Sequence, residues 1–266
     1  MSVPCPFSAV LLAGLLAAAP ALADDRPSPL QPSQSWEAIR GDVAAPGEIR
    51  DGTALYLLDA PKRAEDAAAV PVHVVAAPGA PEVRKLTLII DENPAPVAAT
   101  VELGPAMQPL DLEIRLRVDA YSNVRALVET TDGGQYMTGR FVRASGGCSA
   151  PAATDAAAAA ASLGQMKVRW FDTGADGRRE AQVMLRHPNN SGMQRDQVTL
   201  LFIPADFVDD LRVAQGDETL FTVTGGISIS ENPTFRFRYR PNGAPITIRA
   251  TDTDGGVYQG SFAADS

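Results

Sequence analysis

The sequence predicts an all-β protein: two immunoglobulin-like β-sandwich domains in tandem, after a cleaved signal peptide. Short segments of alternating polar and apolar residues recur from Asp51 onward, and turn signals such as Asp132-Gly-Gly134 separate them. The segments fall into two sets, one on each side of an alanine-rich stretch. About seven short strands in each set, with turns roughly every ten residues, match the pattern of a sandwich domain.

Residues 1–23 have the pattern of a secretory signal peptide. An apolar run from Phe7 to Ala19 precedes Ala21-Leu22-Ala23, which fits a small-x-small cleavage site. The run is shorter than the ~20 apolar residues that cross a membrane, and no later run approaches that length. We therefore expect export to the periplasm and no membrane span.

The composition disfavours several classes of function. The chain carries 32 acidic and 23 basic residues, a formal net charge of −9, which disfavours binding to nucleic acid or to an anionic membrane. It has two histidines and two cysteines, and Cys5 lies in the signal segment. Because a structural zinc site needs about four such ligands, the sequence predicts no metal site, and it predicts no cofactor.

Residues 24–50 are expected to form an N-terminal extension with a short helix. Ser35 is placed to cap a helix from Trp36 to Val43, because a serine hydroxyl can accept a hydrogen bond from a free N–H group of the first turn.

Residues 51–143 are expected to form the first sandwich. Every second residue from Leu112 to Val118 is apolar, so these side chains share one face of a strand. The strands expected in this domain are 54–58, 70–75, 83–90, 98–103, 111–118, 124–130 and 135–142.

Residues 166–266 are expected to form the second sandwich. From Thr234 to Tyr239 aromatic residues alternate with arginines, which indicates an antiparallel strand with one solvated face. Thr131-Asp-Gly-Gly-Gln-Tyr136 recurs as Thr253-Asp-Gly-Gly-Val-Tyr258, which supports two similar domains. The strands expected in this domain are 166–171, 180–185, 198–203, 211–214, 219–224, 234–239, 246–251 and 257–262.

Residues 144–165 are expected to form an exposed linker with some helical content. It contains Gly146, Gly147 and Cys148, followed by six alanines from residue 156 to residue 161. Thr154 or Asp155 could cap a helix over the alanines, and Gly164 could end it.

Cys148 is the main candidate for chemistry, because removal of residues 1–23 leaves it as the single cysteine. It follows two glycines at a domain boundary, outside any apolar periodic run. One interpretation is a presented nucleophile or carrier thiol, since glycines let a backbone approach a partner closely. The other is an incidental linker cysteine. Arg143 is the only cation nearby in sequence, so little lowers the pKa of the thiol.

Other motifs have simpler interpretations. Phe171-Asp-Thr-Gly174 resembles half of an aspartic-protease site, but the sequence has no second copy, so residues 172–177 are expected to form a hairpin loop. Residues 252–255 lack the full ligand series of a calcium loop and are expected to form a turn. His73 is expected at the surface of a strand. His187 is expected in a loop, where it could contact a partner, and a Cys-His dyad with Cys148 would require the fold to bring the two together.

Several motifs in both domains resemble known families. In the first domain they are Leu57-Leu-Asp-Ala-Pro61, Val70-Pro-Val72, Asn93-Pro-Ala-Pro96, Arg117-Val-Asp-Ala-Tyr121 and Phe141-Val-Arg-Ala-Ser-Gly-Gly-Cys148. In the second they are Arg186-His-Pro-Asn-Asn-Ser-Gly192, Arg195-Asp196, Ile227-Ser-Ile-Ser-Glu-Asn-Pro233 and Asp254-Gly255. The first set resembles SoxY, the sulfur-carrier subunit of the periplasmic thiosulfate-oxidising system, and the second resembles its partner SoxZ. The order of the two is similar to that of fused SoxYZ-like carriers associated with quinoprotein dehydrogenases.

This resemblance implies a function for the candidate thiol. SoxY and SoxZ are immunoglobulin-like sandwiches that pair, and SoxY carries sulfur intermediates on the cysteine of a glycine-rich swinging arm. Cys148 matches that cysteine, and Gly146 and Gly147 match the glycines that give the arm its flexibility. The family implies partner enzymes that load, oxidise and hydrolyse the adduct, and no turnover by the carrier itself.

The chain departs from the family pattern in one respect. The family's arm ends its chain, whereas here Ser149-Ala150-Pro151 replaces the trailing glycines and the chain continues. An internal arm presents two strands of backbone to a partner, which points away from the ordinary sulfur-oxidising enzymes and toward the quinoprotein association.

We therefore expect a periplasmic carrier that presents Cys148 for covalent attachment of a small, sulfur-based intermediate. Its partners would be enzymes of sulfur oxidation or a quinoprotein dehydrogenase with its cytochrome. The alternative is a binding module that docks the dehydrogenase or the cytochrome, with an incidental thiol. An enzyme with a catalytic cysteine is the least favoured, because it needs a base near Cys148 in the fold.

Overall fold

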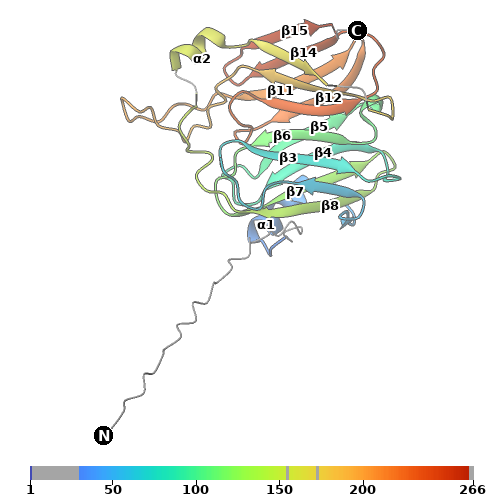
Figure 1. Ribbon diagram of the computed structural model, residues 1–266, viewed down its shortest axis with the longest axis horizontal. Coiled ribbons are helices and arrows are strands. Elements are labelled where there is room, and N and C mark those ends of the chain that lie inside the picture. The colour runs from blue at the N-terminus through green and yellow to red at the C-terminus, as the bar shows by residue number, and fades with distance from the viewer. Residues whose placement is uncertain (2–29, 154–155, 172–173, 264–266) are drawn as a thin grey trace.

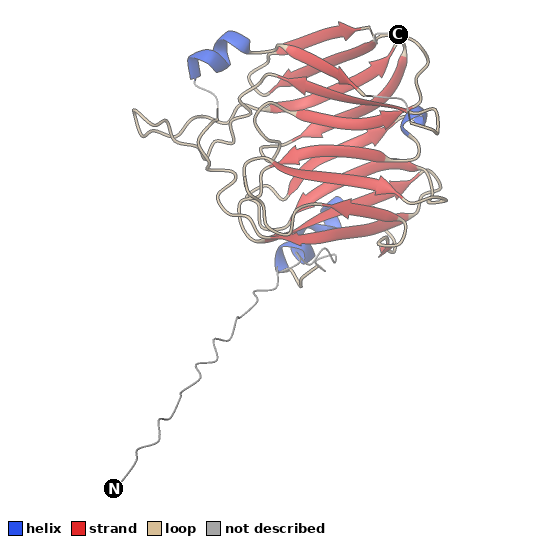
Figure 2. Ribbon diagram, viewed as in Figure 1, coloured by secondary structure: helices blue, strands red, loops and turns tan. Residues whose placement is uncertain are grey.

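Two β-sheets packed face to face run through both halves of the chain in the computed structural model (Figures 1 and 2). The structure describes Met1 and residues 30–153, 156–171 and 174–263. One sheet has nine strands in the order β1-β8-β7-β4-β5-β12-β11-β14-β15, and the other has six in the order β2-β3-β6-β13-β10-β9. The first half lies below the second in Figure 1, from blue and green to orange and red.

Each half contributes one immunoglobulin-like sandwich, as predicted. The first half supplies β1 (Arg50–Asp51), β2 (Tyr56–Asp59), β3 (Val70–Ala76), β4 (Val83–Ile90), β5 (Val97–Leu103), β6 (Asp111–Leu116), β7 (Ser122–Thr130) and β8 (Gln135–Val142). The second half supplies β9 (Met166–Trp170), β10 (Arg179–Leu185), β11 (Val208–Gln215), β12 (Glu218–Gly225), β13 (Thr234–Tyr239), β14 (Ile246–Asp252) and β15 (Val257–Phe262).

The two sandwiches join edge to edge in both sheets. β5 pairs antiparallel with β12, with Val101 opposite Val223, and β6 pairs antiparallel with β13, with Ile114 opposite Phe235. These pairings satisfy backbone groups on four strands that would otherwise be edge strands. The halves are therefore connected by hydrogen-bonded sheets as well as by the linker.

One hydrophobic core extends through both halves. It includes Val72 and Leu86 from the first half and Val183 and Ile248 from the second, all at most 1 % exposed. Phe221 and Phe237 pack edge to face near the junction, with ring centroids 4.9 Å apart. The two halves therefore share an apolar core at their junction, which stabilises the contact between them.

The N-terminal helix covers the outer face of the large sheet. α1 (Gln34–Val43) buries Trp36 against Ile89 and Leu127. Ser33, rather than the predicted Ser35, caps it by accepting a hydrogen bond from the N–H of Trp36. Ser35 instead donates to the Glu92 carboxylate, so the helix begins two residues earlier than expected.

The remaining helices are short. η1 (Pro105–Met107) is a 3-10 turn after β5, and α2 (Ala156–Ser162) forms over the alanines as predicted, with Gly164 beyond its end at φ +76°. The expected caps Thr154 and Asp155 lie outside the described residues, as do residues 2–23 of the predicted signal segment. No helix in the described ranges combines the length and apolarity needed to cross a bilayer.

The strand predicted over residues 198–203 is wrong. This stretch forms a loop that projects from the body between β10 and β11, where one carboxylate organises a tight turn (Figure 1). Asp196 Oδ1 accepts hydrogen bonds from the N–H groups of Val198 and Thr199, and Leu200 adopts φ +59°. An apolar run indicates a strand only when a sheet or core covers it, and residues 198–202 of this run are exposed.

Candidate functional site

The segment that carries Cys148 is folded against the body. After β8, residues 144–153, here called the arm, return to the connection between β6 and β7. The N–H of Gly146 donates to the carbonyl oxygen of Asp119 at 2.7 Å, and that of Gly147 donates to Val118 at 3.2 Å. The N–H of Cys148 donates to Asp119 Oδ1 at 3.1 Å. Cys148 is fully buried, which corrects the expectation that this part of the linker is exposed.

Glycine is required in the arm for close packing as well as for flexibility. A Cβ atom on Gly147 would lie 2.1 Å from the carbonyl oxygen of Ala67 and 2.7 Å from that of Val118. Gly146 has open space around its missing side chain, but its φ of +75° is a conformation that other residues adopt at a cost. The two glycines therefore allow the arm to dock closely on the first half.

The second half also holds the arm. Ser191 donates from its hydroxyl to the carbonyl oxygen of Cys148, and Gln194 donates from Nε2 to that of Ala150 at 3.1 Å. Farther along, the N–H of Ala153 donates to the Glu231 carboxylate at 2.7 Å. The thiol thus lies where the two halves meet. Ser191 and Gln194 were not predicted as arm contacts, although Ser191 lies within the SoxZ-like motif.

The buried environment keeps the thiol protonated. Burial, and after it the Asp119 carboxylate, raise the pKa of Cys148 to about 11, while the Arg117 guanidinium acts in the opposite direction. Because the thiolate is the nucleophilic form, the docked thiol is unreactive at neutral pH. Neither histidine is among the described charged groups that act on this thiol, so no Cys-His dyad forms in the docked arm.

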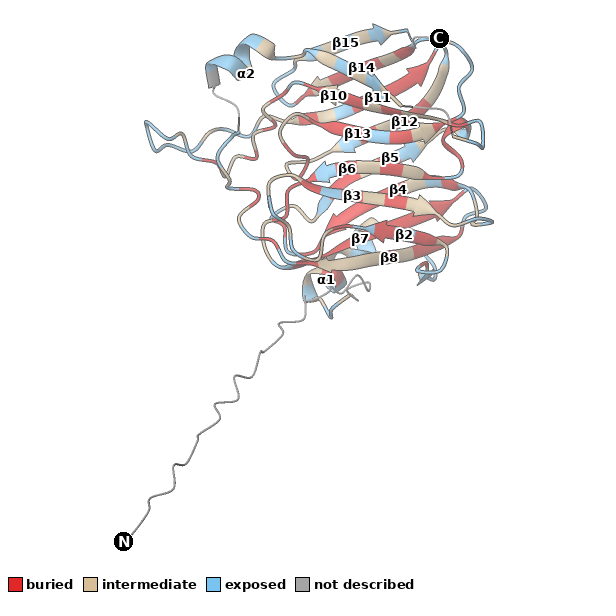
Figure 3. Cartoon of the chain, in the orientation of Figure 1, coloured by how far each residue is buried: buried red, intermediate tan, exposed pale blue. Residues whose placement is uncertain are grey.

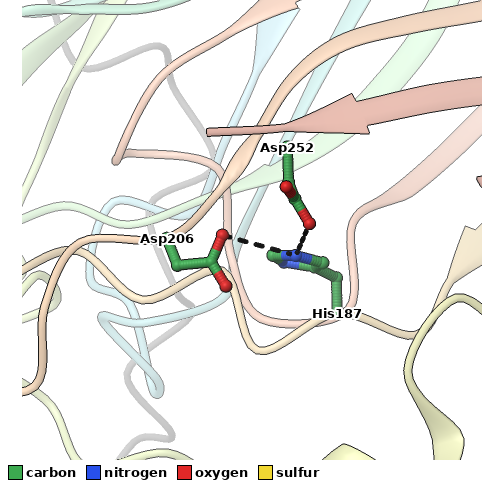
Figure 4. A group of neighbouring side chains, drawn as sticks. All are labelled: His187, Asp206 and Asp252. Carbon is green, nitrogen blue, oxygen red and sulfur yellow. Dashed lines mark hydrogen bonds and ion pairs between the residues drawn. The ribbon is translucent and has the colours of Figure 1, made fainter. Parts of the chain in front are cut away.

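His187 is buried in a group of polar side chains (Figure 4). It lies in the loop between β10 and β11, which also carries Ser191 and Gln194. Its Nε2 is 3.3 Å from Asp252 Oδ2 and 3.8 Å from Asp206 Oδ1. Its Nδ1 accepts a hydrogen bond from the N–H of Asn189 at 3.0 Å. The sequence placed His187 in a loop but gave no sign that it is fully buried.

This group is the set of described side chains that could supply three metal ligands, one nitrogen and two carboxylate oxygens. Asp252 is already engaged by the protein: Tyr258 donates its hydroxyl to Oδ2 at 2.6 Å, and the N–H groups of Asp254 and Gly256 donate to Oδ1. The contacts of His187 with Asp206 and Asp252 connect the loop between β10 and β11 to the end of β14. We therefore assign the group a structural role.

The remaining motifs behave largely as expected. His73 is partly exposed on β3, and the Asp111 carboxylate raises its pKa through a 2.8 Å hydrogen bond. Residues 252–255 form the turn of a hairpin, and Asp132-Gly-Gly134 forms the matching turn in the first half. The other predicted hairpin loop includes residues 172–173, which lie outside the described residues.

The loop between β10 and β11 exposes several apolar side chains after Ser191. Val198, Leu200, Leu201 and Phe202 are 90, 65, 69 and 60 % exposed, and we call them the apolar tip (Figure 3). A cleft of about 470 Å³ separates this loop from α2, and Pro151 and Ala152 of the arm contribute to its wall. Val198 of the apolar tip lines the same cleft as Pro151 and Ala152, which follow the thiol in the chain.

Comparison with known proteins gives an independent assignment. No curated protein sequence matches the chain. Among solved structures, the sulfur carrier protein SoxY from Chlorobium limicola f thiosulfatophilum is similar at 27% identity, over 40% of this chain and 92% of that one, with a TM-score of 0.32. Residues 42–148 match the family described as sulfur oxidation protein SoxY, and residues 166–263 match sulphur oxidation protein SoxZ. The chain therefore belongs to the SoxY and SoxZ families, with one SoxY domain followed by one SoxZ domain.

Proposed function

We propose that the protein is a carrier that binds a small sulfur-based intermediate covalently on Cys148 and presents it to partner enzymes, without turnover of its own. The observation that carries this proposal is the position of the thiol. Cys148 lies at the end of the region that matches SoxY, on an arm that both halves of the chain hold by hydrogen bonds. A residue buried only for packing would not need contacts of this kind on both sides.

The carrier cycle requires the arm to leave its docked position. While the arm is docked, the thiol is buried and protonated, so neither an enzyme nor a small reagent can reach it as a thiolate. Release breaks a few hydrogen bonds, each worth about 1 kcal/mol. We therefore expect the arm to be docked in most molecules and undocked, with a reactive thiol, in a small fraction. Partner enzymes would act on this small fraction.

The compartment and the pathway belong to the same proposal. The apolar segment from Phe7 to Ala19, followed by a small-x-small site, supports export to the periplasm. The arm continues into α2 instead of ending the chain, so a partner has to accept a loop rather than a free tail. This favours a partner with an open groove, and we propose a quinoprotein dehydrogenase system in preference to the ordinary enzymes of sulfur oxidation.

Mass spectrometry of protein isolated from its native cells tests the carrier function. Intact mass under non-reducing conditions, followed by peptide mapping, should find an adduct on Cys148. A Cys148→Ser variant should abolish the adduct and impair growth on the substrate of the pathway. Normal growth and dehydrogenase activity with this variant would show that the protein does not act as a carrier.

The apolar tip supports a second candidate function, a docking module. Exposed clusters of large apolar side chains mark protein contacts, and the tip stands clear of the body. In this case the protein would bind a quinoprotein dehydrogenase or its cytochrome independently of the thiol. Co-purification that survives Cys148→Ser but is lost in a Leu201→Ser/Phe202→Ser double variant would favour docking over carriage.

A further inference from the structure

Two arginines lie directly opposite each other on the outer face of the large sheet, in the second half of the chain. Arg212 on β11 faces Arg249 on β14 in the antiparallel register, and both side chains are exposed. Residues paired in this way have Cβ atoms about 5 Å apart, so two positive charges repel each other and destabilise the sheet. Among the described residues, no carboxylate forms an ion pair with either arginine.

The same row of the sheet places its charges differently in the first half. Lys85 on β4 lies opposite Glu129 on β7 and opposite Glu102 on β5, and its Nζ forms an ion pair with Glu129. The row continues across the junction, where Thr222 on β12 lies opposite Glu102. Thr222 and Gln259 are the outer neighbours of the two arginines, and neither carries a charge. A cation thus lies between two carboxylates in one half and beside another cation in the other.

A groove of about 480 Å³ lies along the arginine pair, over β11, β14 and β15. Both arginines line it, together with the side chains of Thr247, Gln259 and Ser261, and none of its lining residues is acidic. Hydroxyl and amide groups can donate hydrogen bonds, as guanidinium groups do. The groove is therefore lined by donors and positive charge, which suits a negatively charged ligand.

The acidic residues of β11 lie at the other end of this face. Asp209 and Asp210 form a bulge at the start of the strand, opposite Thr251, and Thr251 donates its hydroxyl to Asp209 Oδ1 at 2.8 Å. The guanidinium of Arg212 extends instead toward Thr219, whose Oγ1 accepts hydrogen bonds from Nε and Nη2 at 3.0 and 2.7 Å. Thr219 is paired farther along β11, on the groove side of the arginine. Arg212 is thus held toward the groove and away from the two aspartates.

We propose that Arg212 and Arg249 bind acidic side chains of a partner protein, at a docking surface separate from the arm. Guanidinium groups bind carboxylates through two parallel hydrogen bonds, and a carboxylate between these two would relieve their mutual repulsion. The groove is open along the face of a sheet, whereas sites for small molecules are enclosed and largely apolar. Its shape and charge therefore fit acidic side chains that project from the surface of another protein.

The groove and the contacts of the arm use different residues. The loop that holds the arm through Ser191 and Gln194 precedes the start of β11, whereas the groove lies near Ala214, toward the end of that strand. A partner can therefore dock at the groove while the arm moves, and this docking does not depend on what Cys148 carries. Since the chain has a net charge of −9, a local pair of cations also selects where an acidic partner can approach.

Fluorescence polarisation with a fluorescein-labelled peptide of six glutamates, capped at both ends, tests the proposal. At low ionic strength the full-length protein should bind this peptide although both are acidic, and the affinity should fall as salt is added. Arg212→Gln and Arg249→Gln should each weaken binding about tenfold, because each removes a charged hydrogen-bond donor. A peptide of six glutamines is the control ligand and should not bind.

A charge-matched variant separates this groove from a general loss of positive charge. Arg84→Gln/Arg236→Gln removes two exposed arginines that pair with Glu129 and Glu180 elsewhere, so it should change the affinity less than about twofold. Arg212→Gln/Arg249→Gln should abolish binding. Equal losses in the two double variants, or no binding by the unmutated protein, would overturn the proposal. Displacement of the peptide by an equal concentration of inorganic sulfate would also overturn it, because the groove would then be a site for small anions.

Discussion

The hydroxyl of Ser191 donates a hydrogen bond to the carbonyl oxygen of Cys148, 43 positions earlier in the chain. The residue that holds the arm therefore comes from the SoxZ half, whereas the thiol comes from the SoxY half. Because the two halves share continuous sheets, this contact is formed within one folded body. The SoxZ half thus acts directly on the availability of the thiol.

Removing the contacts from the SoxZ half should release the arm. Ser191→Ala and Gln194→Ala each delete one hydrogen bond to the arm, worth about 1 kcal/mol, so each should raise the population of the open arm about fivefold. The rate of iodoacetamide alkylation at Cys148 measures this population. Ser149→Ala is the matched control, because its hydroxyl bonds only to Gly146 within the arm. Alkylation rates equal to that of the control would contradict this role for Ser191.

The two glycines of the arm should differ in how they respond to alanine. Gly147→Ala forces a methyl group into two carbonyl oxygens and should displace the arm, at a cost of about 2 kcal/mol and a roughly thirtyfold faster alkylation. Gly146→Ala meets no atom closer than 3.7 Å and only strains a positive φ, at about 1 kcal/mol. If the arm were simply a flexible tether, the two variants would react at the same rate.

Stability at alkaline pH should report the buried thiol. The pKa of Cys148 is about 11 in the folded protein against an ordinary value of 9.0, so the folded state holds the proton more tightly. Its contribution is fully present below pH 9 and falls by about 2 kcal/mol as the pH rises toward 11. Urea unfolding of the protein and of Cys148→Ser between pH 8 and pH 10.5 isolates this change, because tyrosines and lysines titrate in both. A constant difference between the two would mean that the thiol is not buried in solution.

The shared core predicts that the two halves unfold together. Each half holds one of the two tryptophans, Trp36 on α1 and Trp170 on β9, so single-tryptophan variants can report the halves separately. Phe237→Ala should destabilise the protein by about 3 kcal/mol, because it removes a ring from the junction core. Both tryptophan signals should shift to the same lower urea midpoint. Two separate midpoints would show that the halves are independent domains.

Most of the strands could be predicted from the sequence because alternation and turn residues are local signals. β4, β8, β13 and β15 begin and end at the predicted residues, and each is bounded by glycine, proline, asparagine or aspartate nearby. The strand predicted over residues 198–203 was wrong because most of its apolar side chains are exposed, and exposure is a property of the tertiary structure. The two-domain arrangement was predicted, but the pairing of β5 with β12 was not, since no local signal marks which edges meet.

The site was predictable only in part, for a similar reason. Cys148 and its glycines stood out because they interrupt the β pattern at a domain boundary. Their docking depends on Asp119, Ser191 and Gln194, which come together only in the fold. Arg117 was noticed within a family motif, but a sequence cannot show that this arginine is buried. Burial and charge pairing are therefore what the structure adds.

The burial of Cys148 also has a consequence for the chemical lifetime of the protein. In the oxidising periplasm that we propose as its location, the thiol of Cys148 would be open to disulfide exchange with other exported proteins and to irreversible oxidation beyond the sulfenic acid. Both reactions require an accessible thiolate, which the docked arm withholds. Damage can then proceed only through the small open fraction. The hydrogen bonds of Ser191 and Gln194, together with those of the arm backbone, would therefore slow the loss of the thiol to oxidation.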